Sequence, residues 1–235
     1  MDVDLSQIEF RLIASAIGNE RIIAQYNKDP KTDFHSMVAD MAGIERGPGK
    51  TLNFTVGFGA GKKRTISVVK NSLDISSVGY QESGMAFDDY CQQQAESMYE
   101  KYHRLMPELN PTKKRATKIA RERGYISNLY GRHRRLPSSG CYKAFNAYIQ
   151  SSAADLAKDL TLQIAAYLRS LPGGRLAWPI GVVHDSWILY VHKSIAVAVG
   201  AEIQRIIEYV SPPIPVKVPI LSDVKISDKN WKECC

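Results

Sequence analysis

Residues 178–192, WPIGVVHDSWILYVH, restrict the fold more than any other stretch of the sequence. Two apolar runs, each of strand length, flank the polar tripeptide His184-Asp185-Ser186. Apolar runs joined by so short a polar segment are typical of a β-hairpin. The segment therefore predicts two antiparallel strands with Asp185 in a tight turn between them.

Helical periodicity dominates most of the remaining chain. The helices that the apolar spacing predicts span residues 6–17, 34–43, 87–102, 144–170 and 194–209. The other predicted strands are the fragment VDL at 3–5, a hairpin in GYISNLYG at 124–131, and a Pro-interrupted edge strand within 211–226. Asp33 has the side chain of an N-cap for the second helix, and the polar residues 71–86 are expected to form a loop. Such a mixture of helices and strands predicts the α+β class.

The charge balance favours an acidic partner, nucleic acid first. Lys and Arg number 31 against 24 Asp and Glu, which gives a formal net charge of +7. Nine of these cations lie within residues 112–135 beside a single Glu. We expect this stretch to bind phosphate backbones without sequence preference, and a solvated basic face is the alternative.

Other functional classes find no support in the sequence. The four cysteines form no CxxC pair, and with five scattered histidines they lack the spacing of a zinc site. No apolar run approaches the ~20 residues of a membrane helix, and the N-terminus lacks the basic region of a signal peptide. We therefore expect reduced thiols, no membrane partner and a cytoplasmic location.

Two carboxylates stand beside apolar strands. Asp4 follows VDL, and Asp185 occupies the predicted hairpin turn. Two carboxylates brought together in apolar surroundings would repel each other, and divalent cations would relieve the conflict. Two Mg²⁺ ions bridged by two aspartates are an arrangement suited to phosphoryl transfer. Taken singly, each residue could equally be an ordinary turn or cap residue.

A second pattern lies in RGPGKTLNFTVGFG. Arg46, Lys50, Phe54 and Phe58 recur every four residues, so on a helix they would form one stripe. Two cations followed by two aromatic rings suit a triphosphate followed by a base. The alternative is an amphipathic helix with a snorkelling basic end.

Several collinear segments together resemble the family A, DNA polymerase I-like, polymerases. DLSQIEFR, RGPGKTLNFTVGFG and VVHDS are similar to the family's motifs A, B and C, usually DYSQIELR, RxxxKxxNFGxxYG and VHDE. DFHSMVADMAG, GYISNLYGRHRRLP, NAYIQSSAADLAK and VPILSDVKISDKNW also resemble family segments. The resemblance covers nearly the whole chain.

The resemblance implies a role for each matching residue. Asp4 and Asp185 would bind two Mg²⁺ ions, or Mn²⁺ in their place, with the Leu5 backbone carbonyl as a further ligand. Lys50 would contact the triphosphate and protonate the leaving pyrophosphate. The nucleotide-binding residues would be Gln7, Glu9, His35, Arg46, Lys50, Phe54 and Phe58. Those in contact with DNA would be Lys113, Lys114, Arg132, Asn146, Gln150 and His184.

Among these, Glu9 would occlude the space of a 2′-hydroxyl and so select dNTPs. Arg46 and His35 would touch the outer phosphates, and Phe54 would stack near sugar and base. Asn146 and Gln150 would reach the minor groove of the duplex. Ordinary polar positions on helices are the alternative for His35, Asn146 and Gln150.

The chain departs from the family pattern at two informative places. Ser186 stands where motif C usually has Glu, and HDS is more typical of the related single-subunit RNA polymerases. Glu9 and Phe58, in contrast, favour DNA synthesis. Pro48 suits the first turn of a helix, which predicts that the motif B helix begins there with Arg46 in the preceding loop.

The implied fold is the palm and fingers of a right-hand polymerase, without a thumb or the N-terminal part of the palm. Residues 1–30 and 136–235 would form the palm with its antiparallel sheet, and residues 31–135 the mostly helical fingers. The implied function is template-directed DNA synthesis from dNTPs on primer-template DNA.

Because motif A lies at the start of the chain, we expect one half of a split, bacteriophage-like polymerase. A second polypeptide would supply the thumb and N-terminal palm and cover an unpaired strand edge near Val3. The chain and its partner would act near the nucleoid of a bacterial or phage-infected cell. The alternatives are an excised fragment, an inactive relative that binds nucleic acid or a partner, and an RNA-polymerase-like enzyme.

Overall fold

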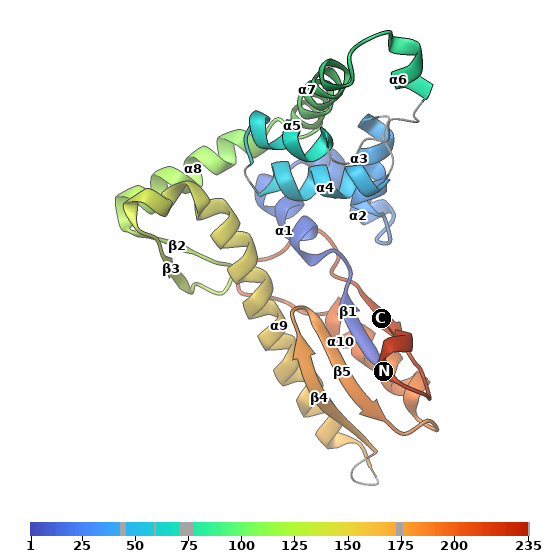
Figure 1. The fold of residues 1–235 in the computed structure, drawn as a ribbon. Helices are drawn as coiled ribbons and strands as arrows, with labels where there is room; N and C mark the ends of the chain where they lie inside the picture. The colour runs from blue at the N-terminus through green and yellow to red at the C-terminus, as the bar shows by residue number, and fades with distance from the viewer. Residues whose placement is uncertain (43–45, 59, 71–77, 173–175, 235) are drawn as a thin grey trace. The chain divides into compact units, whose positions relative to one another are not determined.

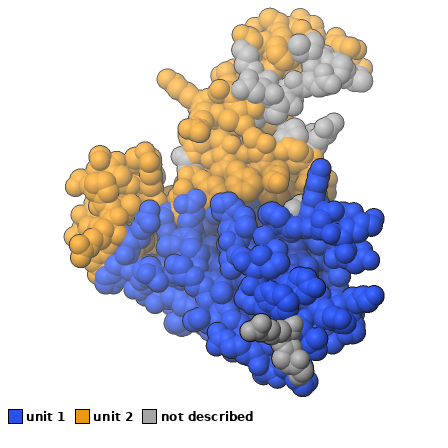
Figure 2. Space-filling model, turned by 60° about the horizontal axis from the view of Figure 1, so that its bottom comes forward, with its two compact units in different colours: residues 1–31, 127–134, 147–235 blue, residues 32–126, 135–146 orange. Residues whose placement is uncertain are grey.

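The computed structural model describes residues 1–42, 46–58, 60–70, 78–172 and 176–234 (Figure 1). Contacts divide the chain into two compact units, coloured separately in Figure 2. Unit 1 comprises residues 1–31, 127–134 and 147–235, and unit 2 comprises residues 32–126 and 135–146. No helix in the described ranges has both the length and the apolar character needed to span a bilayer.

Unit 1 is built on a four-stranded antiparallel sheet in the order β4-β5-β1-β6. Its strands are β1 (Asp2–Leu5), β4 (Ala177–Val183), β5 (Ser186–Val191) and β6 (Ser222–Lys225). β4 and β5 form the predicted hairpin, and β6 is an edge strand as expected. β1 pairs on both sides, so the expectation of an unpaired edge near Val3 is wrong: Val3 is fully buried between Trp187 and Val224.

Two helices cover one face of this sheet. The Trp187 indole donates a hydrogen bond to Thr161 on α9 (Ala144–Ser170), at 2.8 Å. On the same face, Val224 of β6 lies against Gly200 on α10 (Ala196–Glu208). A Cβ at Gly200 would stand 3.0 Å from Val224, so this close approach of helix and strand favours glycine. The face that carries Val3 and Trp187 is thereby buried. The opposite face carries Asp4, Ser186 and Asp223 at one end and the exposed rings of Trp178 and Tyr190 at the other.

The helical pair α1 (Ile8–Ile17) and α2 (Glu20–Lys28) follows β1 and is fixed by one buried arginine. Arg11, 2% exposed, donates hydrogen bonds to the carbonyl oxygens of Ser6, Pro219 and Pro30 at 2.7, 2.7 and 2.8 Å. Its guanidinium also lies 4.7 Å from the centre of the Tyr26 ring. One side chain thus ties the end of β1 to two distant loops.

Unit 2 contains most of the remaining helices. They are α3 (Phe34–Ala42), α4 (Arg46–Gly57), α5 (Lys62–Lys70), α6 (Val78–Ser83), α7 (Phe87–Leu105), α8 (Leu109–Arg123) and the 3₁₀ turn η1 (Ser138–Lys143). Asp33 caps α3 as predicted, because its carboxylate accepts hydrogen bonds from the His35 N–H and the Ser36 hydroxyl. α3 and α4 approach so closely at Gly49 that a Cβ there would stand 2.8 Å from the Ala39 Cβ.

Three local expectations need correction. Residues 78–83, assigned to a polar loop, form α6, while residues 71–77 and the expected stop at Gly43 lie outside the described residues. The hairpin predicted in the basic stretch pairs β2 (Tyr125–Ser127) with β3 (His133–Arg135). Its second strand therefore lies beyond GYISNLYG, the segment in which both strands were expected. Arg46 is the first residue of α4 rather than part of a preceding loop, which leaves Pro48 within the first helical turn.

The buried arginine gives a test of this account of unit 1. We expect Arg11→Met to lower the free energy of unfolding by about 3 kcal/mol, because three buried carbonyl groups lose charged donors. Urea denaturation followed by circular dichroism measures the change. Arg21→Met, at an exposed position on α2, is the matched control, and equal loss in both variants would contradict the role of Arg11.

Candidate active site

Strand pairing brings the two predicted catalytic carboxylates together. Asp4 lies within β1 and is exposed on the polar face of the sheet, opposite Ser186 on β5 and Asp223 on β6. The N–H of Leu5 donates a hydrogen bond to the carbonyl oxygen of Asp185 at 3.2 Å. A backbone hydrogen bond therefore joins the residue after Asp4 directly to the hairpin turn that carries Asp185.

The turn itself has an uncommon backbone conformation. His184 adopts φ of 57°, in the left-handed region that non-glycine residues seldom occupy. This conformation lets the chain reverse between β4 and β5 within two residues, His184 and Asp185. The tight reversal holds Asp185 at the end of the sheet where Leu5 meets it.

The electrostatics of this cluster are unfavourable to negative charge. The pKa of Asp4 rises from 3.8 to about 6, first because surrounding groups partly shield this otherwise exposed carboxyl from water. Repulsion by Asp185, Asp2 and Asp223 adds to the rise, and Lys225 acts in the opposite direction. Burial and the charge of Asp185 also raise the pKa of Glu9 on α1. The site thus concentrates carboxylates whose mutual repulsion a cation would relieve.

This donor set suits a hard divalent cation such as Mg²⁺. Mg²⁺ is commonly held by one or two carboxylates together with waters and substrate phosphate oxygens, rather than by a closed protein cage. Across the described ranges, no three His, Cys, Asp or Glu side chains are grouped so that they could hold an ion by themselves. Asp4 and Asp185 therefore fit a site that substrate oxygens complete.

Unit 2 carries the stripe predicted from motif B. The rings of Phe54 and Phe58 are stacked with centroids 5.8 Å apart, and the His35 ring lies 5.7 Å from Phe54. Phe54 is 38% exposed. Lys50, one turn earlier on α4, is exposed and makes no hydrogen bond or ion pair with any part of the chain that the structure describes.

The other two residues expected at the outer phosphates differ from Lys50. Arg46 forms an ion pair with Asp33 at 2.5 Å, which helps to hold the pKa of Asp33 at about 2. His35 is 4% exposed, and its Nδ1 lies 3.1 Å from the Asn53 side-chain nitrogen. Burial lowers the pKa of His35 to about 4, and the nearby charges of Arg46 and Lys50 act in the same direction. His35 is therefore neutral at physiological pH.

Comparison with known proteins identifies the family of the chain. A sequence model described as DNA polymerase family A matches residues 1–233. The chain belongs to DNA polymerase family A.

Relatives and solved structures of the family extend the comparison. A DNA polymerase DpoZ of Salmonella phage PMBT28 is 29% identical over 98% of this chain and 38% of its own length. A second DpoZ, from Acinetobacter phage SH-Ab 15497, is 30% identical over 97% of this chain and 37% of its own length. Thermostable DNA polymerase I of Thermus aquaticus is 27% identical over 94% of this chain and 26% of its own length. The chain thus spans less than two fifths of the length of each of these relatives.

The fold of the chain also matches a solved polymerase structure. The POL domain of Pol1 from M. smegmatis, in complex with DNA primer-template and dNTP, superposes with a TM-score of 0.72. The sequence identity is 21%, and the match covers 94% of this chain and 38% of that chain. The α+β palm-and-fingers fold class expected from the sequence is therefore confirmed, whereas the division at residues 30 and 135 stays a prediction.

The residues expected at DNA lie in varied surroundings in the family A chain. Lys114, Gln150 and His184 are exposed. Lys113 donates a hydrogen bond to the Val56 carbonyl oxygen at 2.6 Å, and burial lowers its pKa to about 8. Arg132, although 62% exposed at its side chain, pairs with Asp155 at 2.6 Å.

Asn146 differs from the other residues expected at DNA. Its side-chain oxygen is buried, and no donor in the described part of the chain reaches it. Roles in DNA binding for all of these residues stay predictions.

Four residues near Asp4 were not anticipated from the sequence: Asp2, Asp223, Lys225 and Trp231. They line, with Asp4 and Ser186, a cavity of about 330 Å³. Asp2 could have been found, because residues two apart on a strand share a face and Asp4 was already a candidate. The others come from the far end of the chain, and no local pattern links them to β1.

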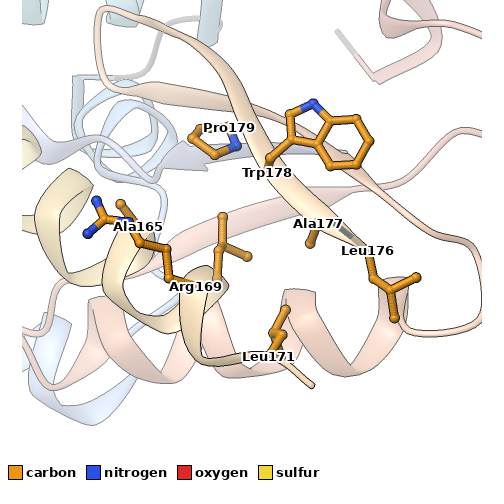
Figure 3. A pocket seen from close by; sticks show the side chains of 8 residues that line it. Ala165, Arg169, Leu171, Leu176, Ala177, Trp178 and Pro179 are labelled. Carbon is orange, nitrogen blue, oxygen red and sulfur yellow. The ribbon is translucent and has the colours of Figure 1, made fainter. Parts of the chain in front are cut away.

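A larger cavity, of about 550 Å³, lies elsewhere in the family A chain (Figure 3). It is formed by the end of α9 and the start of β4, with Leu168, Arg169 and Trp178 among its lining residues. Its lining is mostly apolar and contains neither of the candidate metal ligands. Size alone would therefore have pointed away from the candidate active site.

The raised pKa of Asp4 predicts that its negative charge lowers the stability of the folded chain. Because the folded chain holds this proton more tightly than the unfolded chain, the contribution of Asp4 to stability is most favourable below pH 3.8 and is lost as the pH rises towards about 6. Asp4→Asn removes the charge. In EDTA at about pH 7.5 we expect it to raise the free energy of unfolding by about 1 kcal/mol, a value reduced for solvent screening of an exposed group.

Thermal denaturation in EDTA at about pH 7.5 and about pH 4 measures this effect. The gain from Asp4→Asn should disappear at the lower pH, where the wild-type carboxyl is largely protonated. Asp228→Asn, at an exposed position beyond β6, is the control. The electrostatic account would be wrong if Asp4→Asn and Asp228→Asn had the same stability at both pH values.

Proposed function

We propose that this chain contains the active site of a DNA-directed DNA polymerase, in which a primer 3′-hydroxyl attacks the α-phosphate of a dNTP. The observation that carries the proposal is the junction of motifs A and C. There the Leu5–Asp185 hydrogen bond and the β1–β5 pairing bring the backbones of Asp4 and Asp185 together, and the charge of Asp185 acts on the Asp4 carboxyl. Membership of DNA polymerase family A supports it.

In this proposal Asp4 and Asp185 hold two Mg²⁺ ions, with Mn²⁺ as a substitute and the Leu5 carbonyl as a further ligand. When bound, such ions stabilise charge on phosphoryl oxygens and favour ionisation of the attacking hydroxyl. The chain's own contribution is positioning: the paired strands fix both carboxylates before substrate arrives. The carboxylate repulsion described above supports cation binding here.

The nucleotide-binding role is assigned to α4 and its neighbours. Lys50 is the exposed cation for the triphosphate and the proton donor for pyrophosphate, and the Phe54–Phe58 stack offers an aromatic surface to sugar and base. Arg46 would exchange Asp33 for a phosphate oxygen. Neutral His35 could still donate one hydrogen bond to a phosphate, but it supplies no charge.

Primer-template DNA and a second polypeptide complete the proposal. The basic helix α8 and its hairpin would contact the phosphate backbone. For the second polypeptide, the supporting feature is the outer strand β4, where Trp178, Ile180 and Val182 are 42%, 63% and 46% exposed. Exposed apolar side chains on an edge strand are a surface that another chain can cover.

Primer extension with Mg²⁺ and dNTPs tests the site assignment. The chain should be purified from its source with any polypeptide that accompanies it. We expect Asp185→Ala to reduce extension by about 10³-fold or more, because an ion-stabilised transition state loses several kcal/mol. Asp228→Asn should extend primers as the wild type does. Equal extension by wild type and Asp185→Ala would refute the assignment of the site, and absence of extension in both would favour a role in binding alone.

Sugar selection gives a separate test and addresses the RNA-polymerase alternative. Glu9 lies on α1 beside the carboxylate cluster. If its side chain excludes the 2′-hydroxyl, Glu9→Ala should raise the relative use of rNTPs by about 10- to 100-fold, the range for one small group in a binding pocket. The measurement is single-nucleotide incorporation of dNTP and rNTP. Preference for rNTPs in the wild type would instead support the RNA-polymerase-like alternative.

A further inference from the structure

The site carries a carboxylate that the motifs do not include. Ser186 stands where motif C usually has Glu, so the hairpin lacks the acidic side chain after Asp185. In the structure the Ser186 hydroxyl donates a hydrogen bond to Oδ1 of Asp2. A carboxylate therefore contacts the side chain of residue 186 after all, but it comes from β1 instead of β5.

The position of Asp2 is fixed by its surroundings. It is 8% exposed, and its second oxygen accepts a hydrogen bond from the Trp231 indole at 2.8 Å. Both oxygens are thus held by neutral donors. Within the described part of the chain Asp2 forms no ion pair, although Lys225 is its register partner on β6. Asp2 and Asp4 share the polar face of β1, and both line the cavity of about 330 Å³.

We propose that Asp2 is a positioning residue for the divalent cations, and that together with Ser186 it replaces the acidic side chain of motif C. The inference rests on the proposed function, because it concerns the cation site formed by Asp4 and Asp185. Carboxylates just outside the ligand sphere orient the ligands and add negative potential, and their loss typically weakens metal binding or activity 10- to 100-fold.

A purely structural role for Asp2 is the competing explanation. The Trp231–Asp2 bond also attaches the C-terminal 3₁₀ turn η2 (Trp231–Cys234) to the sheet. Loss of that attachment should be reproduced by Trp231→Phe, which removes the indole donor and keeps the carboxylate. Trp231→Phe should not reproduce the effect of losing the Asp2 charge. The two explanations therefore differ in how the two variants compare.

The main experiment exchanges the carboxylate between the two strands. Asp2→Asn removes the charge with little change in shape, and Ser186→Glu restores an acidic side chain at the usual motif C position. In the combined variant the introduced amide can donate to the introduced carboxylate while its oxygen still accepts from Trp231. Ser186→Glu alone would instead place two carboxylates in contact and should lower the melting temperature in EDTA.

Binding of Mn²⁺ alone, measured by electron paramagnetic resonance on the full chain, is the primary readout. We expect binding to weaken by about 10- to 100-fold in Asp2→Asn. Trp231→Phe should change it by less than about threefold, and Asp2→Asn with Ser186→Glu should return it to within about threefold of wild type. Primer extension should follow the same order, and Asp228→Asn should match the wild type in both assays.

The outcomes separate this inference from the proposed function. If Asp185→Ala weakens Mn²⁺ binding and extension while Asp2→Asn behaves as wild type, the inference fails and the proposed function stands. The inference also fails if Trp231→Phe weakens Mn²⁺ binding as much as Asp2→Asn does. It fails too if the combined variant, Asp2→Asn with Ser186→Glu, folds without recovering Mn²⁺ binding. If Asp185→Ala changes neither Mn²⁺ binding nor primer extension, the proposed cation site is wrong, and the inference about Asp2 fails with it.

Discussion

The antiparallel pairing of β1 with both β5 and β6 is the constraint on which the candidate site depends. It is stabilised by the buried side chains of Val3 and Trp187, whose face is covered by helices. Because strand side chains alternate, burial of Val3 on one face compels Asp2 and Asp4 to occupy the other. The hydrophobic side of the strand thereby determines where its carboxylates lie, and a register shift by one residue would turn them towards the helices.

The same pairing makes the site costly to assemble. Asp4 is placed opposite Asp223 and close to Asp185 and Asp2. Desolvation and then repulsion by these carboxylates raise its pKa, so the folded state disfavours the charge of Asp4. A fold selected for stability alone would replace one of these groups. Retention of the cluster is understandable if a ligand of opposite charge offsets the repulsion, and a divalent cation is such a ligand. Stability and proposed function therefore oppose each other at Asp4.

Much of this arrangement could be predicted from the sequence, because it rests on local patterns. The β4–β5 hairpin, the long helix α9 and the Asp33 cap follow from apolar spacing and a short polar side chain. Asp4 and Asp185 were candidates because they stand beside apolar strands, and the collinear motifs implied metal binding for both, which stays a prediction. What escaped prediction depends on contacts between distant segments. Arg11 has the sequence pattern of a surface cation on an amphipathic helix, yet three carbonyl groups from separate loops bury it.

Other errors have the same physical origin. Helix α6 has no strong apolar periodicity, and the edge-to-face contact between Tyr80 and Phe87 at its junction with α7 is not visible in a local window. The expected open edge at Val3 assumed that β1 had lost neighbours, whereas β6 arrives from residues 222–225 to pair with it. Long-range pairing of this kind has no local signature in the sequence.

The charges around α4 lead to a last consequence for nucleotide binding. Of the two cations in the motif B stripe, Arg46 is neutralised by Asp33 while Lys50 has no partner in the described part of the chain. Under the proposed function, a triphosphate would have to compete with Asp33 for Arg46, but it would meet Lys50 without such competition. The low pKa of Asp33 shows how strongly Arg46 and neighbouring donors hold that carboxylate. The proposed function therefore implies that Lys50 would bind phosphate first, and that Arg46 would follow only where its interaction with phosphate exceeds the existing ion pair.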